Sequence, residues 1–167
     1  VIEAAKAFKD EKQVHFVLIG DGMQKKFLKQ KASEYNLTNI EFIDSVPKHE
    51  VVDYVNASDV CMAILKKTDT FKTVYPNKVF DYMSCKKSVF VTIDGITRDL
   101  IETSNCGLYS EPENIDEFKK VVDKFLNMSD DELQTFGENG YKYVKDKFDR
   151  EKLAERYIEL IKKVSNV

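Results

Sequence analysis

Five short, mainly apolar stretches constrain the fold of this chain more than any other feature. They cover residues 14–19, 40–43, 60–65, 88–92 and 106–109, and helical spacing of apolar residues recurs in the intervals between them. Near-continuous apolar runs are typical of parallel strands that are covered on both faces. Because parallel strands require right-handed crossovers, the alternation predicts an α/β fold, a Rossmann-like three-layer domain with a parallel sheet.

The pattern becomes wholly helical from residue 115 onward. Ser129 and Glu132 have the spacing of a capping box, Gly137 and Gly140 predict breaks, and residues 150–164 predict a terminal helix. We therefore predict a Rossmann-like core over residues 1–112. The remainder, 113–167, is expected to form a helical tail that packs on the same domain, against one flank or edge of the sheet.

The amino-terminal residues 1–8 have helical spacing, whereas a doubly wound domain normally opens with a strand. We therefore expect that the first strand of the sheet is missing and that this chain is a fragment of a longer protein. The chain contains no apolar run long enough to cross a bilayer, and no signal-peptide pattern opens it.

Charge and cysteine content narrow the class of protein. With 26 basic and 29 acidic residues the net charge is -3, so no bulk attraction to nucleic acid is expected. Three cysteines without metal-ligand spacing predict reduced thiols in a cytoplasmic protein, with Cys61 and Cys85 as small core residues. One cluster of basic residues is expected to be a solvated helix face: Lys25, Lys26, Lys29 and Lys31.

Residues 75–92 form the unit around which a binding site is expected. Pro76 predicts a helix start, and the helix leads through Lys86 and Lys87 into the strand at 88–92. The helix would then begin at the carboxyl edge of the sheet, where open α/β sheets bind ligands. Lys78 lies in the first turn of this helix, where its positive charge is repelled by the positive end of the helix dipole. A bound phosphate would make the local interaction favourable. The sequence is equally consistent with a solvated lysine or with an ion pair to Asp81.

A second candidate is the sequence Gly20-Asp21-Gly22, which follows the strand at 14–19 and precedes a helical pattern. This order is that of a dinucleotide-type phosphate loop, in which small residues let the backbone approach an anion. The third glycine of the full fingerprint is absent. By itself, the triplet therefore favours a tight strand-to-helix turn.

Several segments, in this order and spacing, carry a resemblance to a known family: 16–22, 39–42, 57–60, 76–83, 107–108 and the helical tail. Together they resemble the carboxyl-terminal, nucleotide-sugar-binding domain of retaining glycosyltransferases of family 4, which have the GT-B fold. The resemblance covers nearly the whole chain. Its Pro-Asn-Lys sequence at 76–78 is similar to a Pro-Ser-Lys variant found among capsule, O-antigen and cell-wall transferases.

The resemblance implies an enzyme that moves a sugar from a UDP- or GDP-linked donor to a glycan or lipid-linked acceptor. It implies retention at the anomeric carbon and no metal, and no Asp-x-Asp triplet occurs here. The acceptor would bind an amino-terminal domain outside this chain, so the fragment itself is expected to be inactive. The full-length enzyme is expected in the cytoplasm, with a peripheral contact at the inner face of the plasma membrane as a further option.

The resemblance also implies the roles of individual residues, none of them catalytic and none a metal ligand. The loop of Gly20, Asp21 and Gly22 would lie beside the nucleotide. The backbone of Ser45 and Val46 would contact the base. The central helix would offer Asn77, Lys78 and Asp81 to the phosphates and the ribose. Lys78 would contact the diphosphate and Asp81 the ribose hydroxyls. No cofactor beyond the nucleotide-sugar substrate is implied.

The chain departs from the family pattern at several positions. Thr73 stands where the first glutamate of a Glu-x7-Glu motif is expected, and Asp81 replaces the second glutamate. Asp44 stands where glycine is common, so an additional carboxylate lies either near the base or in solvent. Lys86 and Lys87 replace a small Ala-Gly turn.

Two other protein classes compete with this interpretation. A nicotinamide-dependent oxidoreductase is disfavoured by the incomplete glycine fingerprint. Apart from Asp44, the chain also lacks an acidic residue at the end of the next strand, where such enzymes have one. A non-catalytic, flavodoxin-like receiver or partner-binding domain is also disfavoured. Its phosphoacceptor aspartate should lie at the carboxyl end of a strand, whereas Asp59 lies near the start of one. His15 and His49 lack metal-ligand spacing, and Asp94 is expected in a turn.

Overall fold

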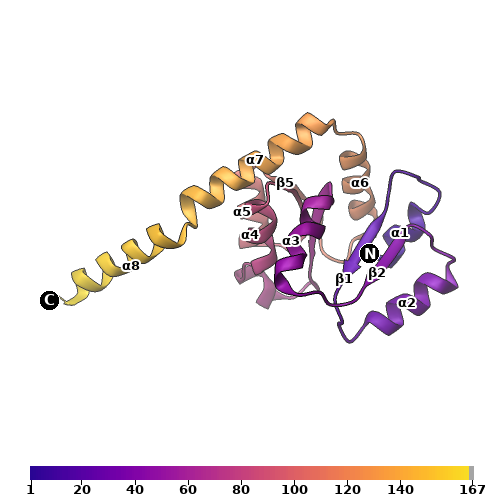
Figure 1. Ribbon diagram of the computed structural model, residues 1–167, viewed down its shortest axis with the longest axis horizontal. Helices are drawn as coiled ribbons and strands as arrows, with labels where there is room; N and C mark the ends of the chain where they lie inside the picture. The colour runs from indigo at the N-terminus through magenta and orange to yellow at the C-terminus, as the bar shows by residue number, and fades with distance from the viewer. Residues whose placement is uncertain (166–167) are drawn as a thin grey trace.

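The computed structural model describes residues 1–165 and has five strands, each parallel to its neighbours (Figure 1). Strands β1 (Phe16–Ile19) and β2 (Ile40–Ile43) form one sheet. Strands β3 (Val60–Ile64), β4 (Ser88–Thr92) and β5 (Gly107–Tyr109) form the other, in that order. The bounds of β2 and β4 are those that the sequence predicts, and the α/β class with parallel pairing is confirmed.

Helices connect successive strands, and they cover both faces of the sheet formed by β3, β4 and β5 (Figure 1). The capping box at Ser129 and Glu132 is present at the start of the longest helix. The helical elements are α1 (Ile2–Ala7), α2 (Lys25–Glu34), α3 (Lys48–Ala57), the 3-10 helix η1 (Asp69–Thr73), α4 (Asn77–Ser84), α5 (Ile96–Ser104), α6 (Ile115–Leu126), α7 (Asp130–Lys147) and α8 (Arg150–Ser165).

Strand β4 lies between two apolar clusters. On one face Val89 and Val91 pack with residues of α4, α5 and α7. On the other face Phe90 packs with residues of α1 and α6, and its ring centroid lies 4.6 Å from that of Phe118. All five residues of β4 are buried, as expected of a parallel strand with helices on both sides.

Among residues 1–165 the five strands form two sheets and not one continuous sheet, because β1 and β3 are not paired with each other. Each of these strands pairs on one edge only. Val17 and Ile19 on β1 are 41% and 38% exposed, although they belong to a predicted buried strand. The sequence-based expectation of a further strand in this sheet stays a prediction.

Helix α7 runs without interruption through Gly137 and Gly140, so the predicted helix breaks at these glycines were wrong. The reason is close packing rather than a turn. A Cβ atom on Gly137 would lie 2.0 Å from the carbonyl oxygen of Lys86, and one on Gly140 would lie 3.0 Å from Cβ of Cys106. Both glycines are buried and let α7 approach the core.

The helical tail is packed only in part. Helices α6 and α7 lie on the core, whereas α8 has no buried residue and projects away from the body (Figure 1). The expected packing of the tail therefore holds for α6 and α7 and not for α8. The apolar side chains exposed along α8 are Leu153, Tyr157, Ile158, Leu160, Ile161 and Val164.

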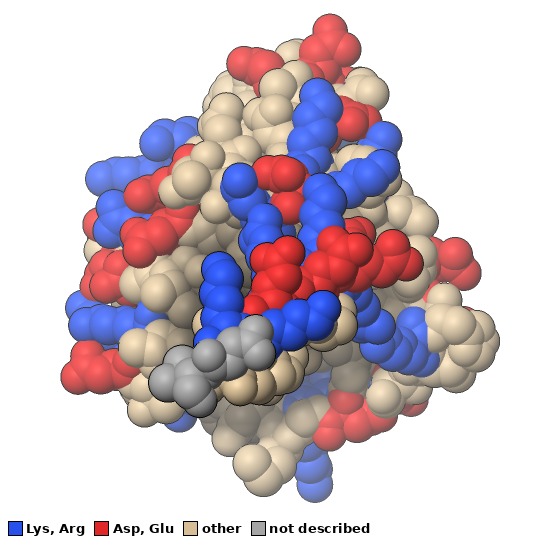
Figure 2. All heavy atoms as spheres, turned by 90° about the vertical axis from the view of Figure 1, so that its left-hand side faces the viewer, with Lys and Arg blue, Asp and Glu red and all other residues tan. Residues whose placement is uncertain are grey.

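On the face seen along α8, Lys and Arg side chains are interspersed with Asp and Glu (Figure 2). Such mixing on this face agrees with the net charge of -3. Within residues 1–165, every helix is too short or too polar to span a membrane. Cys61 and Cys106 are buried free thiols and Cys85 is half-buried, and burial raises the pKa of Cys61 to about 12.

The close approach at Gly137 yields a stability prediction. Gly137→Ala is expected to lower the free energy of unfolding by about 1–3 kcal/mol, because the new methyl group overlaps the backbone of Lys86. This cost exceeds the gain of about 1 kcal/mol in helix propensity. Gly22→Ala is the control, because nothing lies within 4 Å of its added Cβ. Urea unfolding of both variants measures the difference, and equal midpoints would contradict the packing argument.

Candidate functional site

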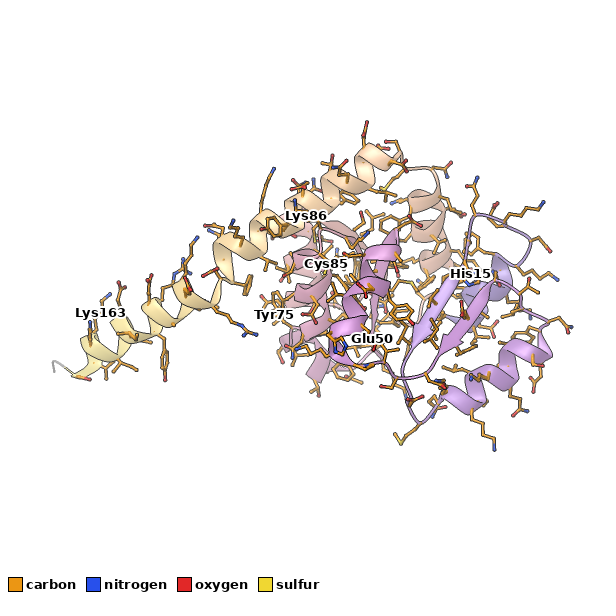
Figure 3. All side chains as sticks on the ribbon, viewed as in Figure 1. His15, Glu50, Tyr75, Cys85, Lys86 and Lys163 are labelled. Carbon is orange, nitrogen blue, oxygen red and sulfur yellow. The ribbon has the colours of Figure 1, made fainter. Side chains whose placement is uncertain are left out.

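Loops that leave the strands gather at the carboxyl edge of the sheets, which is where open α/β sheets bind ligands. Residues 20–22 follow β1, and residues 44–46 follow β2. The helices α3 and α4 begin at this edge as well: Glu50, in the first turn of α3, and Tyr75, just ahead of α4, lie on the same side of the molecule (Figure 3). The sequence-predicted site residues therefore share one edge of the fold.

Asp21 joins the first two of these loops. Its Oδ2 accepts a hydrogen bond from the amide of Ser45 at 2.8 Å, and its Oδ1 accepts one from Nζ of Lys25, also at 2.8 Å. The Lys25 ammonium and the Ser45 amide, in that order of effect, hold the pKa of the Asp21 carboxyl below its ordinary value. Asp21 thus has a structural role in this loop, and the structure brings residues 20–22 and Ser45 together.

Lys25 is the central cation of this cluster. Its Nζ also donates to the carbonyl oxygen of Ile43 at 3.0 Å and to the carboxylate of Asp44. The hydrogen bonds to Asp21 and Asp44 raise the pKa of Lys25. Its side chain is only 16% exposed, so the expectation that Lys25 lies on a solvated face was wrong. The additional carboxylate of Asp44 pairs with Lys25, and the Asp44 side chain is 83% exposed to solvent.

A shallow hollow lies beside this cluster. It has a volume of about 390 Å³, and the loop of β1, the loop of β2 and the first two turns of α2 line it. Its lining residues are Asp21, Gly22, Met23, Lys25, Lys26, Lys29 and Asp44. The hollow therefore belongs to the β1 and β2 loops, while the residues of α4 lie outside its lining.

The amino end of α4 presents the other predicted residues. Asn77, Lys78 and Asp81 are all exposed, and no side chain caps the first turn of the helix. Within the described residues Lys78 makes no ion pair, so the predicted alternative of a pair with Asp81 is not what the structure has. Lys78 is thus a solvated cation beside unsatisfied helical amides.

The segment that leads into α4 is held by a hydrogen bond from the Thr97 hydroxyl to the carbonyl oxygen of Val74, at 2.8 Å, and by aromatic contacts of Tyr75. The ring of Tyr75 lies 5.6 Å from that of Phe80 and 5.9 Å from that of Phe148, measured between centroids. These contacts fix the entry to the helix beside the corner between α7 and α8. They leave Asn77 and Lys78 facing solvent at the carboxyl edge, as a ligand-binding role requires.

A second polar cluster lies at the same edge, between the loop after β3 and the end of β5. Glu111 forms an ion pair with Nζ of Lys67 at 2.6 Å and accepts a hydrogen bond from the Tyr109 hydroxyl at 2.7 Å. The guanidinium of Arg98 lies 4.5 Å from the centroid of the Tyr109 ring. Lys67, followed by Tyr109, lowers the pKa of Glu111. This cluster ties the loop 66–73 to β5.

Sequence reasoning missed both polar clusters in part. Asp21 and Lys25 stand four residues apart at a helix start, a spacing that favours an ion pair and could have indicated their contact. The pairs of Lys25 with Asp44 and of Lys67 with Glu111 join residues that are distant in sequence, so local spacing holds no signal for them.

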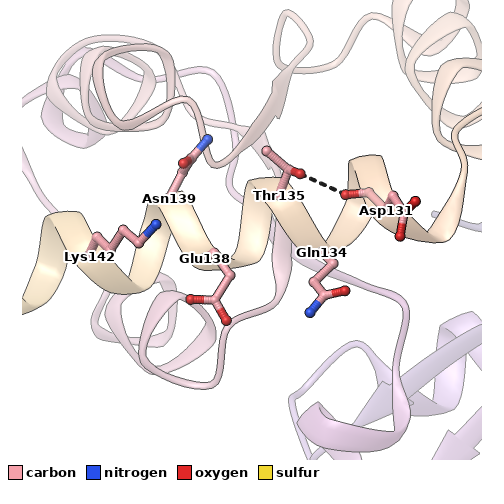
Figure 4. A pocket seen from close by; sticks show the side chains of 6 residues that line it. All are labelled: Asp131, Gln134, Thr135, Glu138, Asn139 and Lys142. Atoms are coloured by element: carbon pink, nitrogen blue, oxygen red, sulfur yellow. Dashed lines mark hydrogen bonds between the residues drawn. The ribbon is translucent and has the colours of Figure 1, made fainter.

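Another hollow lies along the exposed face of α7, far from the carboxyl edge loops (Figure 4). The Thr135 hydroxyl within it donates to the carbonyl oxygen of Asp131 at 2.7 Å, an ordinary bond within the helix. The lining comes from a single helix, so it offers no converging groups to a ligand. Among residues 1–165, no three side chains of the metal-ligating types gather as a metal site would need.

Comparison with known proteins gives the family. Residues 1–143 match the family described as Glycosyl transferases group 1. A curated relative, the uncharacterized glycosyltransferase MJ1178 of Methanocaldococcus jannaschii, is 27% identical over 138 residues, which are 83% of this chain and 37% of the relative. The chain thus spans little more than a third of the length of this relative.

Solved structures show the same fold. Sucrose-phosphate synthase of Thermosynechococcus elongatus matches 99% of this chain and 42% of its own, with a TM-score of 0.80 and 19% identity. HepE of Anabaena, in complex with UDP-glucose, matches 97% of this chain and 44% of its own, with a TM-score of 0.79 and 19% identity. The fold is therefore that of the Rossmann-like carboxyl-terminal half of GT-B proteins, as predicted.

The Asp21 cluster yields a prediction on pH. Because the folded pKa of Asp21 lies below the ordinary value of 3.8, its ion pair stabilises the fold above that pH. That contribution is lost as pH falls through the lower, folded pKa. Carboxyl-carbon NMR titration is expected to give an Asp21 midpoint below 3.8, and Lys25→Met is expected to move it back upward. Identical midpoints in the two proteins would contradict the cluster.

Proposed function

This chain belongs to the family Glycosyl transferases group 1, and on that premise we propose that it is the donor-binding domain of a retaining, family 4 glycosyltransferase. The domain binds a nucleotide sugar, and the longer enzyme transfers the sugar to a hydroxyl group of a glycan or lipid-linked acceptor. Family membership decides against the nicotinamide-dependent and flavodoxin-like alternatives.

One observation supports this function more than any other. Two loops at the carboxyl edge, after β1 and β2, are joined through the Asp21 carboxylate, and a helix with an uncapped first turn begins at the same edge. Small residues, free amides and a solvated lysine together suit a nucleotide diphosphate. HepE, which has the same fold, has been solved with UDP-glucose and supports this ligand class.

We assign the residues as follows. Gly20, Asp21 and Gly22 border the nucleotide, and the backbone of Ser45 and Val46 contacts the base. Asn77 and Lys78 contact the diphosphate, because an ammonium at a helix amino terminus offsets phosphate charge together with the free amides. Asp81, one turn further along α4, accepts hydrogen bonds from ribose hydroxyls. None of these residues is assigned a catalytic role.

The proposal extends to the acceptor and to the biological role of the full-length enzyme. The Pro-Asn-Lys sequence at 76–78 supports capsule, O-antigen or cell-wall polysaccharide synthesis. Transfer without a metal is also proposed, and undiminished transfer in the presence of a chelator tests it. The cytoplasmic location, and the peripheral membrane contact of the full-length enzyme, stay predictions from the sequence.

Removal of the Lys78 ammonium tests the donor site. Lys78→Ala in the full-length protein is expected to weaken binding of UDP or GDP by roughly tenfold or more, since a hydrogen bond to a charged group is lost. Thermal unfolding should change little, because Lys78 is exposed. Lys124→Ala, an exposed change in the last turn of α6, serves as the control in calorimetric titration. Unchanged affinity in Lys78→Ala would reject its contact with the diphosphate.

The short length of the chain relative to its relatives yields a second test. The chain spans 42% of the solved sucrose-phosphate synthase chain and 44% of the solved HepE chain, so we propose that groups needed for acceptor binding lie outside it. Purified alone, it is expected to bind nucleotide weakly and to give no transfer from a panel of UDP- and GDP-sugars. Robust transfer by the 167-residue chain would overturn this part of the proposal.

A further inference from the structure

We propose that Lys25 is a positioning residue, which holds the loops after β1 and β2 at the spacing that nucleotide binding needs. This inference rests on the proposed function. It assigns to Lys25 no contact with the ligand and no catalytic role. Its effect reaches the nucleotide through Asp21, Asp44 and Ser45.

Three chain segments meet at the Lys25 ammonium group. Nζ of Lys25, at the start of α2, bonds to Asp21 in the β1 loop and to Asp44 and the Ile43 carbonyl at the end of β2. The same Asp21 carboxylate receives the Ser45 amide at 2.8 Å. The lysine and the aspartate therefore form one continuous bridge between the two loops.

Few other hydrogen bonds join these two loops. The last backbone hydrogen bond between them runs from the amide of Gly20 to the carbonyl of Ile43, at 3.1 Å. Beyond it, within residues 1–165, the hydrogen bonds from one loop to the other are those of the Asp21 and Lys25 side chains. Gly20 has φ 135°, and a Cβ atom on Gly20 or Gly22 would meet nothing within 4 Å. A loop this open needs a tether to keep one conformation.

The position of the Lys25 charge within α2 also favours a role in this bridge. Lys25 occupies the first turn of α2, where a cation opposes the helix dipole, and that turn contains no acidic residue. The helix alone gives no reason for a lysine there, whereas the two carboxylates do. The adjacent Lys26 is exposed and lines the same hollow without taking part in the bridge, so it offers a matched control.

The experiment compares Lys25→Met, Lys25→Arg and Lys26→Met with the unchanged full-length protein. Lys25→Met is expected to weaken UDP or GDP binding about tenfold in calorimetry and to speed hydrogen exchange at the Ser45 amide. In turnover, the loss should fall on KM for the donor, with kcat within about twofold. Lys25→Arg should restore most of the affinity, since a guanidinium can bridge both carboxylates.

The outcomes separate this inference from the proposed function. If the unchanged protein binds no nucleotide of the panel, the proposed function fails and the positioning role fails with it. If it binds nucleotide and Lys25→Met binds equally well, only the positioning role is overturned. A loss in Lys26→Met as large as that in Lys25→Met would also overturn it, because general charge at the hollow would then explain the effect.

Discussion

Complete burial of β4 is the constraint on which the rest of this fold depends. A strand with five buried residues needs apolar partners above and below, and Val89, Phe90 and Val91 each contribute about 1.5–3 kcal/mol when fully buried. Helices α4, α5 and α7 supply one cover, and α1 and α6 supply the other. Since α4 packs on β4 through Val79 and Met83, its amino end is carried to the carboxyl edge of the sheet. The position of Asn77 and Lys78 therefore follows from packing.

The strands could be predicted because burial on both faces leaves a direct mark in the sequence. The bounds of β2 and β4 match the predicted runs, and the capping box of α7 is a local pattern as well. Gly137 and Gly140 misled the prediction, since a glycine needed for close packing and one needed for a turn look alike in a sequence. The exposure of α8 could not be predicted from the sequence either. An apolar stripe shows which side chains a helix could bury, but not whether another part of the chain packs against them.

The candidate site was predictable at the level of loops and not at the level of contacts. The order of strands and helices indicated a loop site at residues 20–22 and at the start of the helix at 77–81, and the family resemblance added Ser45 and Val46. The structure has all of these segments at one edge. The role of Asp21 differs in kind from a simple ligand contact, because both of its oxygens are engaged by protein donors. Lys25 and Asp44 are 19 residues apart, so only the register of β1 with β2 brings them together. Chemistry that depends on such pairs can be inferred only from the fold.

The unpaired edges of β1 and β3 have a consequence for handling the chain in solution. An uncovered strand edge offers a row of free amide and carbonyl groups, and β1 adds the exposed apolar side chains of Val17 and Ile19. Such an edge is a template for pairing with a strand of another molecule, and natural sheets usually shield it with charge, proline or a bulge. The segment from Phe16 to Ile19 contains none of these shields. At high concentration, intermolecular sheet growth from β1 is therefore a route by which this chain would aggregate.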